Sequence, residues 1–128
     1  MKPLEITSSM RTLSGIFYPK GYAFVMFPTA ECAQQVASQN FDHAMLLTPA
    51  QVLLEVGQVK DDSDVELPSV GTEGATVRKF IDLAREGHHA LMVKIESDDD
   101  TERLMVAARA ASFSYGQRYH LLAMEDLE

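Results

Sequence analysis

Residues 20–27 read Lys-Gly-Tyr-Ala-Phe-Val-Met-Phe, the most aromatic and apolar strand-like run of the chain. Gly21 and Pro28 bound a run of aromatic, aliphatic and β-branched residues at 22–27, so we predict a strand there, with a turn before it at 18–21. Successive side chains point to opposite faces of a strand. One face of this strand carries Ala23, Val25 and Phe27, and the opposite face carries Tyr22, Phe24 and Met26.

A second strand of the same apolar character is predicted at residues 90–95, Ala-Leu-Met-Val-Lys-Ile. The first strand is followed by a helix that Thr29 caps and then by a short strand at 44–47. The second is followed by a helix that Ser97 caps and by a last strand at 118–124. Two such βαβ halves predict an α+β, ferredoxin-like split βαβ fold. We expect a four-stranded antiparallel sheet with the strands 22–27 and 90–95 in its middle and helices mainly on one face.

Extra helices are predicted between the two halves. Residues 48–51, Thr-Pro-Ala-Gln, form a capping box with proline at the first helical position, which indicates a short helix that stops at Gly57. Thr72 is expected to cap a longer helix. Its apolar residues are spaced as one helical stripe, namely Val77, Phe80, Ile81 and Ala84.

Length and composition fit one domain with one sizeable core, because the chain has 128 residues and 46% of them are apolar. We divide it into a loose arm (1–14), a first half with the short helix (15–57), an acidic linker (58–70) and a second half (71–128). The single cysteine, Cys32, excludes an internal disulfide and favours a reducing, cytoplasmic location. No secretory signal and no stretch of membrane-spanning apolar length are recognised, so a membrane is not expected as a partner.

The net charge of −8 argues against a nucleic-acid backbone as the main partner. The charge is unevenly distributed, however. Residues 1–60 hold four basic and four acidic side chains, so the whole excess of acid lies in 61–128.

The strand alternation predicts an interaction face on the sheet. If the helices cover one face, the opposite face presents aromatic residues and methionine to solvent, a larger apolar patch than scattered exposed residues make. Its members are Tyr22, Phe24, Met26, Met92, Lys94 and Tyr119. We therefore expect a non-catalytic interaction module, either a homodimer joined by a two-fold axis or a domain that binds another protein through this face.

The stretch 20–27 resembles the octapeptide of the RNA-recognition motif at every position. The resemblance implies single-stranded RNA binding, with bases stacked on Tyr22 and Phe24 and phosphate near Lys20. In that family the octapeptide lies on the third strand, whereas only 19 residues precede it here. The other central strand also has Met92 where that family has an aromatic ring. RNA binding is the alternative to self-association.

The C-terminal two thirds of the chain resemble uncharacterised bacterial domains of ferredoxin-like fold. The resemblance rests on the segments 70–78, 84–88 and 119–122. It implies a family without an assigned activity and supplies no catalytic residue.

No catalytic or metal constellation is predicted, and no cofactor. His88 and His89 are adjacent and point to opposite faces of a strand, so they do not bind one metal together. Asp98, Asp99 and Asp100 fit the first turn of a capped helix better than a calcium loop, which needs alternating acids and a glycine. Cys32 is expected to be a small core residue. An enzyme with a site at the dimer seam remains a third hypothesis, without nominated residues.

Overall fold

The computed structural model describes residues 19–39, 41, 43–56, 71–119 and 124–127, so the predicted arm (1–14) and acidic linker (58–70) lie outside the described residues. The strands form one antiparallel sheet in the order β2-β3-β1-β4-β5. Their bounds are β1 Tyr22–Phe27, β2 Ala44–Leu47, β3 His89–Lys94, β4 Tyr115–Tyr119 and β5 Met124–Asp126. The predicted four-stranded plan with β1 and β3 in the middle is confirmed, and β5 extends it by one strand.

The helices begin where the sequence offers capping groups. Thr29 and Ser97 cap two of them, and the predicted capping box of Thr48 and Gln51 is complete, with both reciprocal hydrogen bonds present. Thr72 falls inside its helix rather than before it. The bounds are α1 Ala30–Ala37, α2 Pro49–Gln51, a π-helical turn η2 Val52–Val56 that continues α2, α3 Gly71–Arg85 and α4 Asp98–Ala110.

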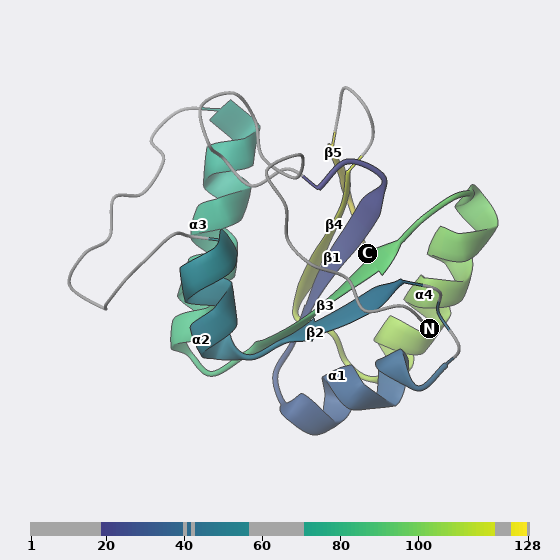
Figure 1. The fold of residues 1–128 in the computed structure, drawn as a ribbon, viewed down its shortest axis with the longest axis horizontal. Coiled ribbons are helices and arrows are strands. Elements are labelled where there is room, and N and C mark those ends of the chain that lie inside the picture. Colours follow the sequence, from purple (N-terminus) through teal and green to yellow (C-terminus); the bar gives the residue numbers. More distant parts are fainter. Residues whose placement is uncertain (1–18, 40, 42, 57–70, 120–123, 128) are drawn as a thin grey trace.

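One face of the sheet is covered by α1 and α4 (Figure 1). The odd-numbered residues of β1 and β3 lie on this face, as the alternation predicts, and they share a buried cluster with Ala33 and Val36 of α1 and with Leu104 of α4. The strand residues of this cluster are Ala23, Val25 and Phe27 of β1, Ala44 of β2, and Leu91 and Val93 of β3. The helical layer expected from the sequence is therefore present on the expected face.

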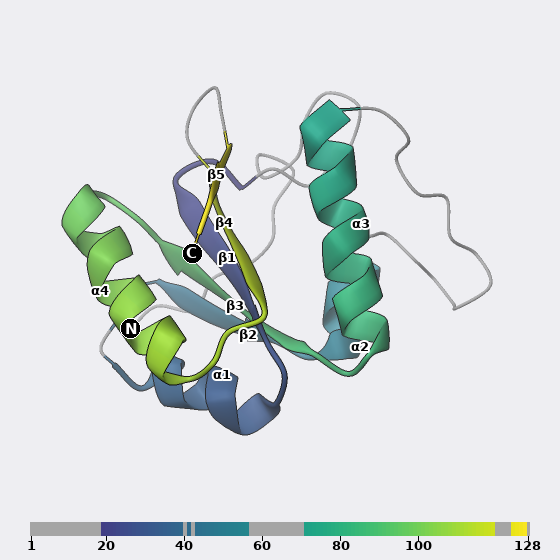
Figure 2. The ribbon, with the colours of Figure 1, turned by 180° about the vertical axis from the view of Figure 1, so that it is seen from behind.

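The opposite face is covered too, which corrects the expectation that the helices lie mainly on one face. Figures 1 and 2 show α2 and α3 on the side of the sheet away from α1 and α4. The predicted stripe on α3, from Val77 to Ala84, is buried in a second apolar cluster that contains Phe24 and Met92. A helix with such a stripe has to bury it, and the apolar face of the sheet is the surface that buries it.

The strand predicted to start at Arg118 starts earlier in the structure, as β4, at Tyr115. The missed residues include Gly116 and Gln117, and glycine weakens the sequence signal of a strand. Here the absence of a side chain is what permits close packing, because a Cβ at Gly116 would lie 3.3 Å from Val25 Cγ2 and 3.4 Å from Leu127 Cδ1. The predicted strand 118–124 is thus replaced by β4 and β5.

Substitution of Phe24 by alanine tests whether α3 covers this face in solution. Phe24 is fully buried, with its ring 4.5 Å from that of Phe80 on α3, so Phe24→Ala should lower the free energy of unfolding by about 3–5 kcal/mol in urea titrations. Val106→Ala, at a side chain that is 62% exposed, should change it by less than about 0.5 kcal/mol. A loss of less than about 1 kcal/mol for Phe24→Ala would mean that the ring is not enclosed.

Candidate functional site

The sheet face that we expected to be free is buried within one chain. Phe24, Met26 and Met92 have no exposed surface, and Tyr119 is 1% exposed. The prediction that these residues share one face of the sheet is correct. The prediction that this face is exposed is wrong, because it packs against Phe80 and its neighbours on α3. These residues stabilise the fold rather than offer a binding surface.

The remaining members of that face lie at its rim. Tyr22 is half-buried against the cluster, and Lys94 is exposed at the end of β3, where its Nζ lies 3.6 Å from a carboxylate oxygen of Glu96. Lys20 is exposed in the turn before β1. Of the three residues that the RNA-recognition resemblance implies, only Lys20 is fully accessible, and stacking of a base on Phe24 would require α3 to leave the sheet.

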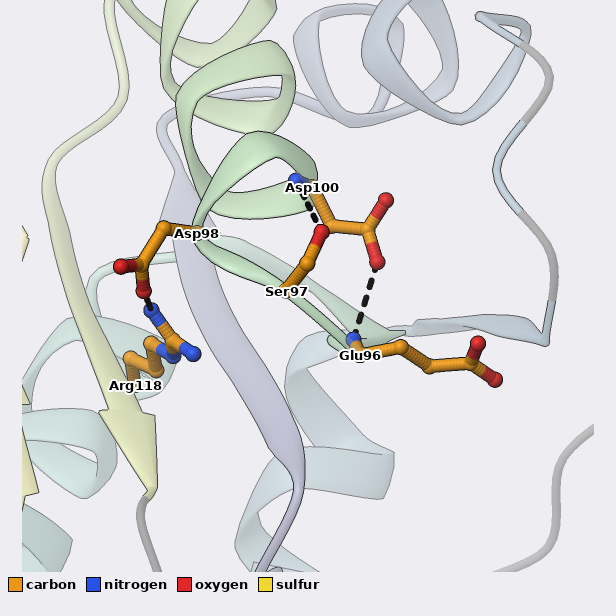
Figure 3. A network of polar contacts seen from close by, with 5 residues as sticks. All are labelled: Glu96, Ser97, Asp98, Asp100 and Arg118. Carbon is orange, nitrogen blue, oxygen red and sulfur yellow. Dashed lines mark hydrogen bonds and ion pairs between the residues drawn. The ribbon is translucent and has the colours of Figure 1, made fainter.

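A network of polar contacts surrounds the start of α4 (Figure 3). Ser97 Oγ accepts a hydrogen bond from the Asp100 amide at 3.3 Å, and the Asp100 carboxylate accepts one from the Glu96 amide at 2.9 Å. The guanidinium of Arg118, on β4, donates to the Asp98 carboxylate at 2.7 Å. The predicted capping role is confirmed, although Asp100 bonds the amide before the cap residue rather than the amide of Ser97. The Ser97 and Asp100 contacts cap the start of α4, and the Arg118–Asp98 ion pair links that end of the helix to β4.

The histidines in the described part of the chain do not form a metal-binding cluster. No group of three or more His, Cys, Asp or Glu side chains with metal-binding proximity exists among the described residues. His88 Nδ1 lies 2.7 Å from Ser114 Oγ, and His89 lies at the start of β3 on the opposite side of the strand. Cys32 is half-buried against the α1–α4 cluster. No helix in the described part of the chain has the length and apolarity needed to cross a membrane.

A shallow groove of about 400 Å³ runs between α1 and α4. Its walls combine Gln35 of α1 and Gln39 just after that helix with Arg103, two alanines and the exposed Val106 of α4. The Arg103 guanidinium lies 4.8 Å from the centre of the Phe41 ring. The groove is open and carries both polar and aliphatic side chains, and Val106 gives it an exposed aliphatic residue on a helix rather than on a sheet edge.

The outer edge of β2 is an unpaired strand edge. β2 pairs with β3 on one side, and no strand of the described chain pairs with it on the other. The Lys94 amide donates to the His43 carbonyl, so His43 and Lys94 form a hydrogen-bonded pair. In an antiparallel ladder hydrogen-bonded pairs alternate with non-hydrogen-bonded pairs along the strand. Met45 and Leu47 therefore direct their backbone groups towards β3, whereas Ala44 and Leu46 direct theirs outward. An edge of this kind is a template for another strand.

The side chains around this edge are apolar and uncharged. Residues 43–54, which we call the edge segment, are the longest stretch of the sequence without Asp, Glu, Lys or Arg. They contain two of the three exposed large apolar residues among the described ones, Leu46 at 41% and Leu54 at 54% exposed. A notch of about 210 Å³ lies beside Leu46, walled by small residues of α1, Ala30 and Ala33. The edge segment is our candidate functional site.

The opposite edge of the sheet has the contrary chemistry. β5 is only three residues long, and two of them are acidic, Glu125 and Asp126. Short, charged edge strands resist pairing with another chain. Natural sheets protect their edges in this way, so among the described strands the contrast marks β2 as the edge better suited to pairing.

No family model matches the chain, and no curated protein or solved structure matches it significantly. Sequence inspection overlooked the edge segment, although its lack of charge is visible in a chain of net charge −8. The missing information was the position of β2 at the edge of the sheet.

Removal of the Ser97 hydroxyl tests whether the acidic cluster has a purely structural role. Ser97→Ala should lower the free energy of unfolding by about 1 kcal/mol, because the Asp100 amide loses its acceptor, while Ser97→Asn should retain most of the stability. Urea titration measures both. Millimolar Mg²⁺ or Ca²⁺ should leave the melting temperature unchanged, and a rise that disappears in Asp98→Asn would instead identify a cation site.

Proposed function

We propose that this protein is a non-catalytic, cytoplasmic interaction module that self-associates through the edge segment, residues 43–54. The observation that carries the proposal is an edge strand that is uncharged, unpaired among the described residues and bears an exposed leucine, in a chain of net charge −8. Self-association was also expected from the sequence, but the interface that we now propose is the edge of the sheet instead of its face.

Electrostatics support the choice of this surface. Two copies with a net charge of −8 repel each other, and the repulsion is smallest where they meet through surfaces without acidic residues. The edge segment meets that condition, because it contains no acidic residue between Asp42 and Glu55. The acidic β5 edge and the start of α4, with Asp98, Asp99 and Asp100, do not.

A charge placed on the edge should weaken the dimer. Full burial of a leucine side chain is worth about 1.5–3 kcal/mol. Leu46 is 41% exposed in one chain and a symmetric dimer buries two copies of it, so Leu46→Lys should raise the dimer dissociation constant at least roughly 10- to 60-fold. Val106→Lys, on α4 and also at an exposed aliphatic residue, should leave it unchanged within about twofold. Light scattering at a series of micromolar concentrations gives the mass of the wild type and of both variants, and circular dichroism checks that they fold.

Salt and RNA separate this proposal from the alternative. Added NaCl screens the repulsion between acidic copies, so self-association should strengthen between low and physiological ionic strength. RNA binding would weaken, because each phosphate contact releases counterions. A wild type that stays monomeric throughout the micromolar range contradicts self-association. Micromolar binding of mixed-sequence single-stranded RNA at physiological salt would favour the alternative function.

A further inference from the structure

We infer that the edge strand β2 pairs antiparallel with β2 of a second copy about a two-fold axis, so that two sheets join into one continuous sheet. The inference rests on the proposed self-association and adds its geometry. We assign the edge to a second copy for two reasons. An uncharged edge meets no acidic side chains when it pairs with the same uncharged edge of another copy. In the register described next, the outward hydrogen-bonding groups and the side chains of the two β2 strands also match each other.

The outward backbone groups of β2 fix the register. Ala44 and Leu46 each present one N–H donor and one C=O acceptor to the outside of the sheet. When Ala44 of one copy faces Leu46 of the other, both residues form hydrogen-bonded pairs, and symmetry repeats the pair on the other side of the axis. All outward donors and acceptors of these two residues are then satisfied. Met45 faces Met45 of the second copy on the axis itself.

The side chains fit this register. Ala44 and Leu46 share the face of the sheet that α1 covers, since Ala44 belongs to the buried cluster beneath α1 and residues two apart in a strand share a face. The large Leu46 then lies beside the small Ala44 of the second copy, next to the notch walled by Ala30 and Ala33. Met45 lies on the other face, against the α3 cluster.

The neighbouring sequence limits the pairing to two copies. Thr48 and Pro49 start α2 immediately after Leu47, so the strand cannot be prolonged in that direction. The other end of the joined sheet is the acidic β5 edge. A symmetric pairing that uses each β2 edge once produces a closed dimer rather than a fibre.

Engineered cysteines test the register. In a Cys32→Ser background of the full chain, Met45→Cys places two thiols at a non-hydrogen-bonded position on the axis, where Cα atoms lie about 4.5 Å apart, within disulfide range. Leu46→Cys is the matched control, since the two copies of residue 46 are displaced along the strands by two residues and lie too far apart. Under mild oxidation we expect the covalent dimer to form at least about tenfold faster for Met45→Cys. Denaturing electrophoresis without reductant measures it.

The outcomes distinguish this inference from the proposed function. Cross-linking of Met45→Cys alone, in a protein whose wild type is dimeric by light scattering, supports the register. A dimeric protein in which Leu46→Cys cross-links as fast as or faster than Met45→Cys, or in which neither cross-links, overturns the edge pairing and leaves self-association intact. A monomeric wild type overturns both. The mass of each variant under reducing conditions confirms that the cysteine has not itself altered assembly.

Discussion

The sheet has two apolar faces, and this constraint governs the rest of the structure. The alternation in β1 places Ala23 and Val25 on one side and Phe24 and Met26 on the other, and no face of it is polar. Two helical layers are therefore needed. α1 and α4 supply one, and α3 with α2 and η2 supplies the other, with Phe80 in contact with Phe24 at a ring separation of 4.5 Å. Burial on both sides is the main source of stability in such a layered domain.

The same constraint determines where a partner can bind. A sheet whose faces are both covered interacts through its edges or through the outer surfaces of its helices. The two edges differ in chemistry: β5 carries Glu125 and Asp126, whereas β2 lies in the uncharged edge segment and exposes Leu46. Because natural proteins usually protect exposed strand edges with charge, proline or a covering element, an uncharged edge next to exposed leucines favours use of that edge as an interface.

Much of the fold could be predicted from the sequence because its signals are local. The bounded apolar runs gave β1 and β3, and the caps at Thr29 and Ser97 gave the starts of α1 and α4. The stripe on α3 was also recognised, but a periodic pattern does not say which surface will bury it, so the second helical layer was missed. β4 was placed too late because Gly116 is favourable only next to Val25 and Leu127, which is a tertiary property. The candidate site depends on strand order, and strand order is not local.

Amide hydrogen exchange at Ala44 and Leu46 reports on pairing at the β2 edge, because these are the two β2 residues whose N–H groups point out of the sheet. We predict that both amides exchange rapidly at protein concentrations far below the dimer dissociation constant and become protected together as the concentration rises, while the amide of Met45 is protected at both. Residue-resolved exchange at two concentrations supplies the result. Fast exchange at Ala44 and Leu46 in a sample shown to be dimeric would contradict the claim that the edge of β2 is the interface.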